Sequence, residues 1–175
     1  MNNLNESNIA LIFDLDYTIW PFWVDTHIKP PFTKESENLI KDAYNYKIQL
    51  YKDVKEIFEK LKERGYLLCS ISRTWEPEYA KQLIKMFNLD KYLKHTIFDT
   101  GSKINGIKKI IKKENLKGMN YCALFDDEDR NIEDAKRNNV FAIHVDENYG
   151  ITKKIVNDNL KKLHESLGIK FNDIF

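Results

Sequence analysis

Cysteine and arginine are both scarce in this sequence of 175 residues. The two cysteines, Cys69 and Cys122, stand in apolar runs. A chain of this length needs no disulfide framework, so we expect buried thiols in a reducing compartment. Arginine occurs only at positions 64, 73, 130 and 137, and 28 basic residues balance 27 acidic ones to a formal net charge of +1. This balance gives no support to a nucleic-acid partner bound through a basic field.

Long apolar runs and a nucleotide-binding glycine loop are missing as well. No apolar stretch approaches the roughly 20 residues that a membrane helix needs, and the polar start Met-Asn-Asn-Leu-Asn lacks the layout of a signal peptide. None of the six glycines lies in a loop ending in Gly-Lys-Ser or Gly-Lys-Thr, so a Walker-type site is not supported. We therefore expect a soluble, cytoplasmic protein that is monomeric and has no membrane partner.

Short apolar runs of strand length recur along the chain. Their apolar character is continuous and does not alternate, at residues 9–13, 66–71, 96–98, 121–125 and 140–145. A parallel strand covered by helices on both faces requires such a run. The runs therefore predict an α/β fold with five core strands in a parallel sheet.

Segments with helical period separate these runs. The first begins after Asp53, a candidate N-cap, and ends before Gly65. Further helices are expected at about residues 76–88, 103–114, 129–138 and 151–166. Helices that alternate with parallel strands are expected to cover both faces of the sheet.

The stretch from about residue 20 to 50 has no long helical period. It is too long for a plain connection, so we expect a functional flap with a short hairpin near residues 44–51. The hydrophobic fraction of 42% is enough for a folded core, and the length suits one domain over residues 1–175 with this flap inserted.

Two pairs of carboxylates follow strands of the predicted sheet. Asp14 and Asp16 come directly after the first apolar run, and Asp126 and Asp127 come directly after the fourth. A lone Asp-x-Asp is more typical of a polar turn than of a metal site. Two unpaired carboxylates at a strand end, however, repel each other unless a metal ion or a lysine neutralises them. Mg²⁺ prefers oxygen ligands, usually one or two carboxylates with a phosphate oxygen. The acids therefore indicate a magnesium site.

Groups suited to phosphate follow the other two strands. Ser72 and Arg73 come after the second run, with a hydroxyl and a planar guanidinium that can hold phosphate, and the neighbouring Thr74 is expected to cap a helix. Lys103 follows the third run at a helix start, after Ser102. Because parallel strands bring their carboxyl ends to one mouth, we expect these groups and the four acids to converge.

In this order, the residues resemble the four motifs of the haloacid dehalogenase (HAD) superfamily, whose members are mostly phosphotransferases with an aspartyl nucleophile: Asp14-x-Asp16-x-Thr18, Ser72, Lys103 and Asp126-Asp127. From about residue 8 to 165 the chain is similar to the small eukaryotic magnesium-dependent phosphatases of that superfamily, with Trp75 and Asp129 as departures beside the motifs. The resemblance implies a Rossmann-like sheet of strand order 5-4-1-2-3 and a minimal cap made by the flap.

The resemblance also implies roles for the site residues. Asp14 is expected to attack phosphorus, and Asp16 to protonate the leaving oxygen and later to accept a proton from water. The phosphoryl oxygens are assigned to Ser72 and Lys103, and the phosphate or the leaving group to Arg73. Trp20 is expected to contact the substrate, which is a phosphorylated small molecule or phosphoprotein such as phosphotyrosine, a sugar phosphate or a phosphorylated glycated amine.

Magnesium is expected to bind the Asp14 side chain, the Asp16 backbone carbonyl and Asp127. Asp126, paired with Lys103, and Thr18 are assigned to support from behind these ligands. His27, His95, His144 and His164 show no metal spacing and are expected to be structural.

Two alternatives use similar residues. A signalling receiver domain also places acids, a hydroxyl and a lysine around magnesium, but its acceptor Asp follows the third strand alone, whereas here that strand is followed by Asp99-Thr-Gly-Ser-Lys103. A HAD-fold binding protein without turnover is the second alternative, and the presence of Asp14 and Asp16 argues against it.

Overall fold

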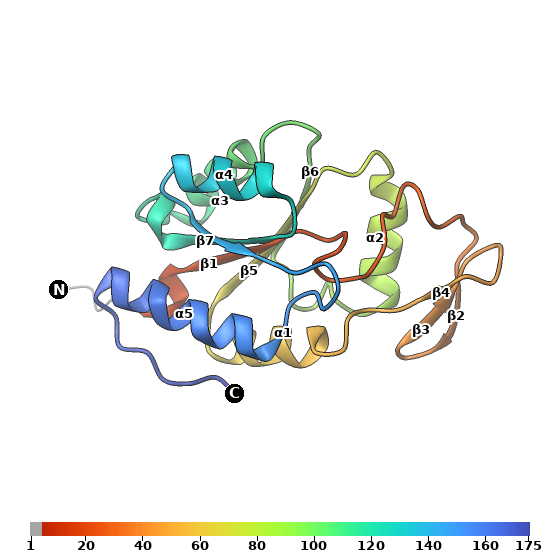
Figure 1. Ribbon diagram of the computed structural model, residues 1–175, viewed down its shortest axis with the longest axis horizontal. Coiled ribbons are helices and arrows are strands. Elements are labelled where there is room, and N and C mark those ends of the chain that lie inside the picture. The colour runs from red at the N-terminus through yellow and green to blue at the C-terminus, as the bar shows by residue number, and fades with distance from the viewer. Residues whose placement is uncertain (1–4) are drawn as a thin grey trace.

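The five apolar runs form a parallel sheet at the centre of the computed structural model, which describes residues 5–175 (Figure 1). Its strands are β1 (Ala10–Phe13), β5 (Leu67–Ser72), β6 (His95–Phe98), β7 (Cys122–Asp126) and β8 (Phe141–His144), in the spatial order β6-β5-β1-β7-β8. Every pairing is parallel, and Ala10 lies opposite both Leu67 and Cys122. Counted without the flap strands and from the β8 edge, the order reads 5-4-1-2-3. The α/β, Rossmann-like fold class is confirmed.

Helices cover both faces of the sheet. Figure 1 shows α3 (Lys103–Glu114) and α4 (Asp129–Arg137) above the strands, with α1 (Val54–Glu63) and α5 (Lys153–Leu167) below them. Leu11 and Phe13 pack with α1, α5 and α2 (Pro77–Met86), whereas Ala10 and Ile12 pack with α3 and α4. Because successive strand side chains point to opposite faces, β1 must be apolar throughout.

Local chemistry defines several helix ends. Ser102 Oγ accepts a hydrogen bond from Ile104 N at 3.2 Å, which places Lys103 at the first position of α3. Asp53 stands at the N-cap position of α1, as expected, but its carboxylate makes no capping hydrogen bond. That carboxylate instead accepts from the backbone of Lys153 at 3.5 Å, so it links the starts of α1 and α5.

The flap is a three-stranded antiparallel sheet, made of β2 (Thr33–Ser36), β3 (Leu39–Lys41) and β4 (Lys47–Ile48). A hairpin confined to residues 44–51 is therefore wrong, because β4 pairs with the earlier β3. The buried Asp42 carboxylate accepts hydrogen bonds from the backbones of Lys29, Tyr44 and Tyr46, and so forms the turn between these strands.

Both cysteines and His164 are buried in the interior of the protein. Cys69 and Cys122 are buried free thiols, and burial raises the pKa of each to about 12. His164, on α5, shares a hydrogen bond of 2.7 Å with Tyr66, and its ring lies against Phe171 of the C-terminal tail. Among residues 5–175, no His takes part in a cluster able to hold a metal.

No helix of the described chain combines the length and the apolar character that crossing a membrane requires.

Candidate active site

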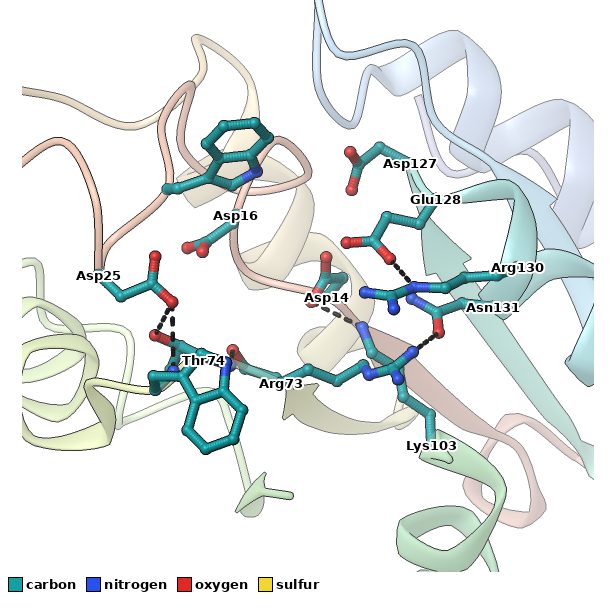
Figure 2. A pocket seen from close by; sticks show the side chains of 13 residues that line it. Asp14, Asp16, Asp25, Arg73, Thr74, Lys103, Asp127, Glu128, Arg130 and Asn131 are labelled. Atoms are coloured by element: carbon teal, nitrogen blue, oxygen red, sulfur yellow. Dashed lines mark hydrogen bonds and ion pairs between the residues drawn. The ribbon is translucent and has the colours of Figure 1, made fainter. Parts of the chain in front are cut away.

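The carboxyl ends of β1, β5 and β7 and the start of α3 surround one pocket of about 210 Å³ (Figure 2). Its lining contains the expected site residues Asp14, Asp16, Ser72, Arg73, Lys103 and Asp127. It also contains residues to which the sequence analysis assigned no part in catalysis or binding, namely Trp23, Asp25, Thr74, Trp75, Glu128, Arg130 and Asn131. The topology therefore brings the strand-end motifs together, as a parallel sheet predicts.

Lys103 joins two of the acids. Its Nζ lies 2.6 Å from Asp14 Oδ1 and 2.5 Å from Asp126 Oδ2, and its side chain is 3% exposed. Burial lowers the pKa of Lys103, but the two carboxylates raise it more, so the ammonium stays charged. Burial raises the pKa of Asp14 well above its usual range, although the charge of Lys103 opposes this shift. The pairing expected between Lys103 and Asp126 is present.

Asp126 and Asp127 differ in what they can still bind. The Asp126 carboxylate accepts from Glu128 N at 2.9 Å, from Asn131 Nδ2 at 3.0 and 3.1 Å and from Lys103, so both of its oxygens are occupied. No side chain of residues 5–175 donates a hydrogen bond to the Asp127 carboxylate. Burial, and then the charge of Asp126, raise the pKa of Asp127 to about 6. Of the two, Asp127 has the oxygens available to a cation.

The donor set fits magnesium. One oxygen each from Asp14, Asp126 and Asp127 can lie within 4.8 Å of the others. Two ligands of an octahedral Mg²⁺ are about 3 to 4 Å apart, so a cation between Asp14 and Asp127 suits this separation. Because both oxygens of Asp126 already accept hydrogen bonds, the two candidate ligand carboxylates are those of Asp14, which follows β1, and Asp127, which follows β7.

Asp16 is held by two donors from the flap segment. Trp20 Nε1 donates to Asp16 Oδ1 at 2.7 Å, and Val24 N donates to Asp16 Oδ2 at 3.2 Å. Burial nevertheless raises the pKa of Asp16 to about 7. A carboxyl group with this pKa exists in both protonation states near neutrality, which general acid–base chemistry requires.

Trp20 does not contact the pocket. Its side chain is 0% exposed and stacks on Phe22, with 5.6 Å between the ring centroids. The expectation that Trp20 touches substrate is therefore wrong: Tyr17 N donates to Trp20 O at 2.8 Å, and the chain turns back so that the indole is buried behind Asp16. Phe22 is in the core and Phe32 is partly buried against it.

The loop after β5 lies across the pocket from the α4 start. Ser72 Oγ accepts from Thr74 N at 3.3 Å, and its own hydroxyl hydrogen can point to a ligand. Arg73 is oriented by Asn131 Oδ1 at 3.0 Å and by Thr100 O at 3.4 Å. Thr74 Oγ1 accepts from Glu76 N at 3.1 Å, within the loop before α2. The N-cap position of α2 is Glu76, whose side chain makes no capping hydrogen bond, so the expectation that Thr74 caps the helix is wrong.

Thr18 forms a hydrogen bond through its backbone carbonyl and, within residues 5–175, none through its side chain. Thr18 O accepts from Ile151 N at 3.0 Å, whereas its buried hydroxyl oxygen has no hydrogen-bond partner in the described chain. The resemblance implied that the Thr18 side chain supports the metal ligands, but this hydroxyl contacts none of them through a hydrogen bond. Asn131, which the sequence analysis missed, has that position instead, because one turn of α4 brings it back to Asp126. The sequence did offer a signal for Asn131: it is a polar residue on the buried face of the short helix that follows Asp126 and Asp127.

In the absence of magnesium, the protein should be more stable at about pH 5 than at about pH 8. Burial raises the pKa of Asp16 to about 7 and that of Asp127 to about 6, from 3.8. The folded state therefore keeps protons that the unfolded state releases, and this stabilisation is complete below about pH 4 and is lost as the pH rises through 6 to 7. Thermal melting in EDTA across this range measures the effect; a melting temperature that climbs from pH 5 to 8 contradicts it.

Comparisons with known proteins agree with this chemistry. A family model described as Acid Phosphatase matches residues 8–166. Magnesium-dependent phosphatase 1 of Homo sapiens is 40% identical over 134 residues, covering 77% of this chain and 76% of the human protein. A HAD-like hydrolase superfamily protein of Schizosaccharomyces pombe is 39% identical over 137 residues, covering 71% and 78%. The fold resembles the crystal structure of a HAD-superfamily hydrolase from Ehrlichia chaffeensis, with a TM-score of 0.62 at 13% identity over 93% of this chain and 98% of that one.

Proposed function

Since the chain belongs to the acid phosphatase family, and with it to the magnesium-dependent phosphatases of the HAD superfamily, we propose that it hydrolyses phosphate monoesters through a phosphorylated Asp14. The observation that carries this proposal is the position of the Asp14 carboxylate, which lines the pocket, lies 2.6 Å from Lys103 Nζ and has an oxygen within 4.8 Å of one oxygen of Asp127. A carboxylate can approach an anionic phosphate only where positive charge is gathered around both.

Asp14 is the nucleophile. One of its oxygens attacks phosphorus, the bond to the leaving oxygen breaks, and an acyl phosphate forms. Lys103 orients the other oxygen, through the contact to Oδ1, and its charge offsets the negative charge brought by the substrate. Asp126 and Asn131 hold Lys103 and its partners in place from behind.

Asp16 is the proton carrier. The protonated carboxyl group donates to the leaving oxygen, and the resulting carboxylate then takes a proton from the water that attacks the acyl phosphate. Its pKa of about 7 supports both steps near neutral pH. Trp20 and Val24 are positioning residues that fix the two oxygens of Asp16 by hydrogen bonds.

The phosphoryl oxygens are held by Ser72 and Lys103, and Arg73 faces the phosphate or the leaving group. Both Ser72 and Arg73 line the pocket, and Arg73 is already oriented by Asn131 at 3.0 Å. Asp14, the Asp16 carbonyl and Asp127 would hold magnesium, which would supply positive charge to offset the charge of the phosphate.

The candidate substrates are phosphotyrosine, sugar phosphates and phosphorylated glycated amines. The flap strands β2, β3 and β4 form only a small sheet, and none of their residues lines the pocket, so a large leaving group has room. A HAD-fold binding protein without turnover is the competing proposal, and it predicts phosphate binding without hydrolysis.

Purified protein should hydrolyse p-nitrophenyl phosphate in the presence of magnesium and lose this activity in EDTA. The cation offsets charge between Asp14 and Asp127, the two carboxylates that would otherwise repel phosphate. Initial rates over a magnesium titration, with restoration after EDTA, measure the dependence. Equal rates in EDTA would contradict the metal requirement, and tight phosphate binding without turnover would favour the binding protein.

A further inference from the structure

Asp25, in the flap segment, accepts hydrogen bonds from the loop that follows β5. Its Oδ2 accepts from Trp75 N at 3.2 Å and from Thr74 Oγ1 at 3.4 Å, and Figure 2 shows the Asp25 carboxylate pointing at Thr74. One carboxylate thus joins two segments that lie about fifty positions apart in the chain. It fixes the backbone from which the Trp75 side chain projects.

The same short loop is held from its other side. Thr74 N donates to Ser72 Oγ at 3.3 Å, and Thr74 Oγ1 accepts from Glu76 N at 3.1 Å. Trp75 therefore lies between Thr74, which is hydrogen-bonded to Ser72, and the start of α2 at Pro77. The backbone N–H groups of Thr74, Trp75 and Glu76 all have partners, so the backbone from which the Trp75 side chain projects is held beside the pocket.

Trp75 itself is 76% exposed, although it lines the pocket. An exposed indole at the rim of a site lined mainly by charged groups is a flat apolar surface with no partner in the described chain. Trp23, 49% exposed, is a second indole on the same lining, and its ring already stacks on His27 at 5.3 Å. Trp75 is the one of the two that has no ring stacked against it among residues 5–175.

We propose that Trp75, held at the pocket rim by Asp25, is a specificity-determining residue that favours phosphate monoesters whose leaving group has a flat apolar face. The proposal rests on the proposed function, because it takes the reacting phosphate to lie in the pocket beside Asp14 and Lys103. A leaving group that emerges from there passes the Thr74–Trp75 rim and stacks on the indole. Aromatic pairs of this kind change a binding constant by about two- to twelvefold.

Trp75→Ala should raise KM for phenyl phosphate by roughly two- to twelvefold and leave kcat almost unchanged, since the indole acts on binding and not on the reacting atoms. The constants for glycerol phosphate, which has no flat apolar face, should not change, and Trp75→Phe should recover most of the loss. Tyr44→Ala is the matched control, because Tyr44 is 80% exposed and lies outside the pocket lining. Equal changes for both esters, or none for phenyl phosphate, would overturn the proposal.

Binding of non-hydrolysable ligands separates this proposal from the proposed function. Calorimetry with magnesium should show that Trp75→Ala weakens phenylphosphonate by the same factor and leaves methylphosphonate unaffected. If the wild-type protein hydrolyses neither ester, the proposed function fails, and the phosphonate comparison still decides the role of Trp75. Unchanged phenylphosphonate affinity would overturn that role.

The contribution of Asp25 is tested by its own pair of variants. Asp25→Asn keeps an oxygen that can accept from Trp75 N, whereas Asp25→Ala removes the link. The ratio of kcat/KM for phenyl phosphate to that for glycerol phosphate should be retained in the first variant and fall in the second. An unchanged ratio in Asp25→Ala would show that Trp75 does not depend on Asp25.

Discussion

Replacing Asp14 with asparagine should lower phosphatase activity by more than about a thousandfold, because the amide cannot form the acyl phosphate. The fold should survive. Lys103 keeps its contact with Asp126 at 2.5 Å, and the burial that raises the pKa of Asp14 shows that the charged form is costly to hold in the folded state. We therefore expect a melting temperature in EDTA that is equal to or above that of the wild-type protein.

A matched control distinguishes loss of the nucleophile from a general loss of negative charge. Asp129 lies beside the acidic motif after β7, and its side chain is 94% exposed. Asp129→Asn should retain nearly all activity. If Asp14→Asn kept a tenth of the wild-type rate with magnesium present, Asp14 would not be the nucleophile.

Replacing Lys103 with methionine should damage both activity and stability. The substitution removes the ammonium that stands between Asp14 and Asp126, leaving buried carboxylates without their counter-charge. Breaking a buried ion pair in this way typically costs about 3 to 5 kcal/mol of unfolding free energy. Loss of the charge that faces the phosphoryl group should lower kcat by about a hundredfold or more. Denaturant titration and steady-state kinetics measure the two effects separately.

The loss of stability in Lys103→Met should depend on pH and magnesium. Low pH protonates the carboxylates and removes their repulsion, so the loss should be smaller at about pH 5 than at about pH 8. Magnesium should partly restore stability, because it supplies positive charge next to Asp14. Lys81→Met is the control: Lys81 pairs with Glu78 at 2.6 Å on an exposed surface, where ion pairs contribute little. Equal losses in Lys103→Met and Lys81→Met would contradict the account of the buried pair.

The strand-end residues could be predicted from the sequence because the topology leaves them little freedom. Once β1, β5 and β7 are parallel neighbours, Asp14, Ser72 and Asp126 must emerge at the same edge of the sheet. Lys103 follows from the Ser102 cap, which begins α3 at that edge. Strand periods and helix caps are local signals, so they can be read without knowing the tertiary structure.

The flap and the rim residues could not be predicted in the same way. Trp20 was assigned to the substrate because it follows Asp14 and Asp16 closely in the chain, but its ring is fully buried in the core and stacks on Phe22. The contacts of Asp25 with Trp75 and of Asn131 with Arg73 join distant segments, and no local periodicity signals them. The β3–β4 pairing depended on the buried Asp42 and its three backbone donors.

Chemical trapping of the intermediate tests the role of Asp14 most directly. Turnover of p-nitrophenyl phosphate with magnesium is stopped by acid, and borohydride then reduces any acyl phosphate to an alcohol, which converts the modified aspartate to homoserine. Mass spectrometry of the peptide that contains Phe13 to Thr18 should find homoserine at position 14 in the wild-type protein and none in Asp14→Asn. Active enzyme without homoserine at this position, or with homoserine at Asp16, would contradict Asp14 as the nucleophile.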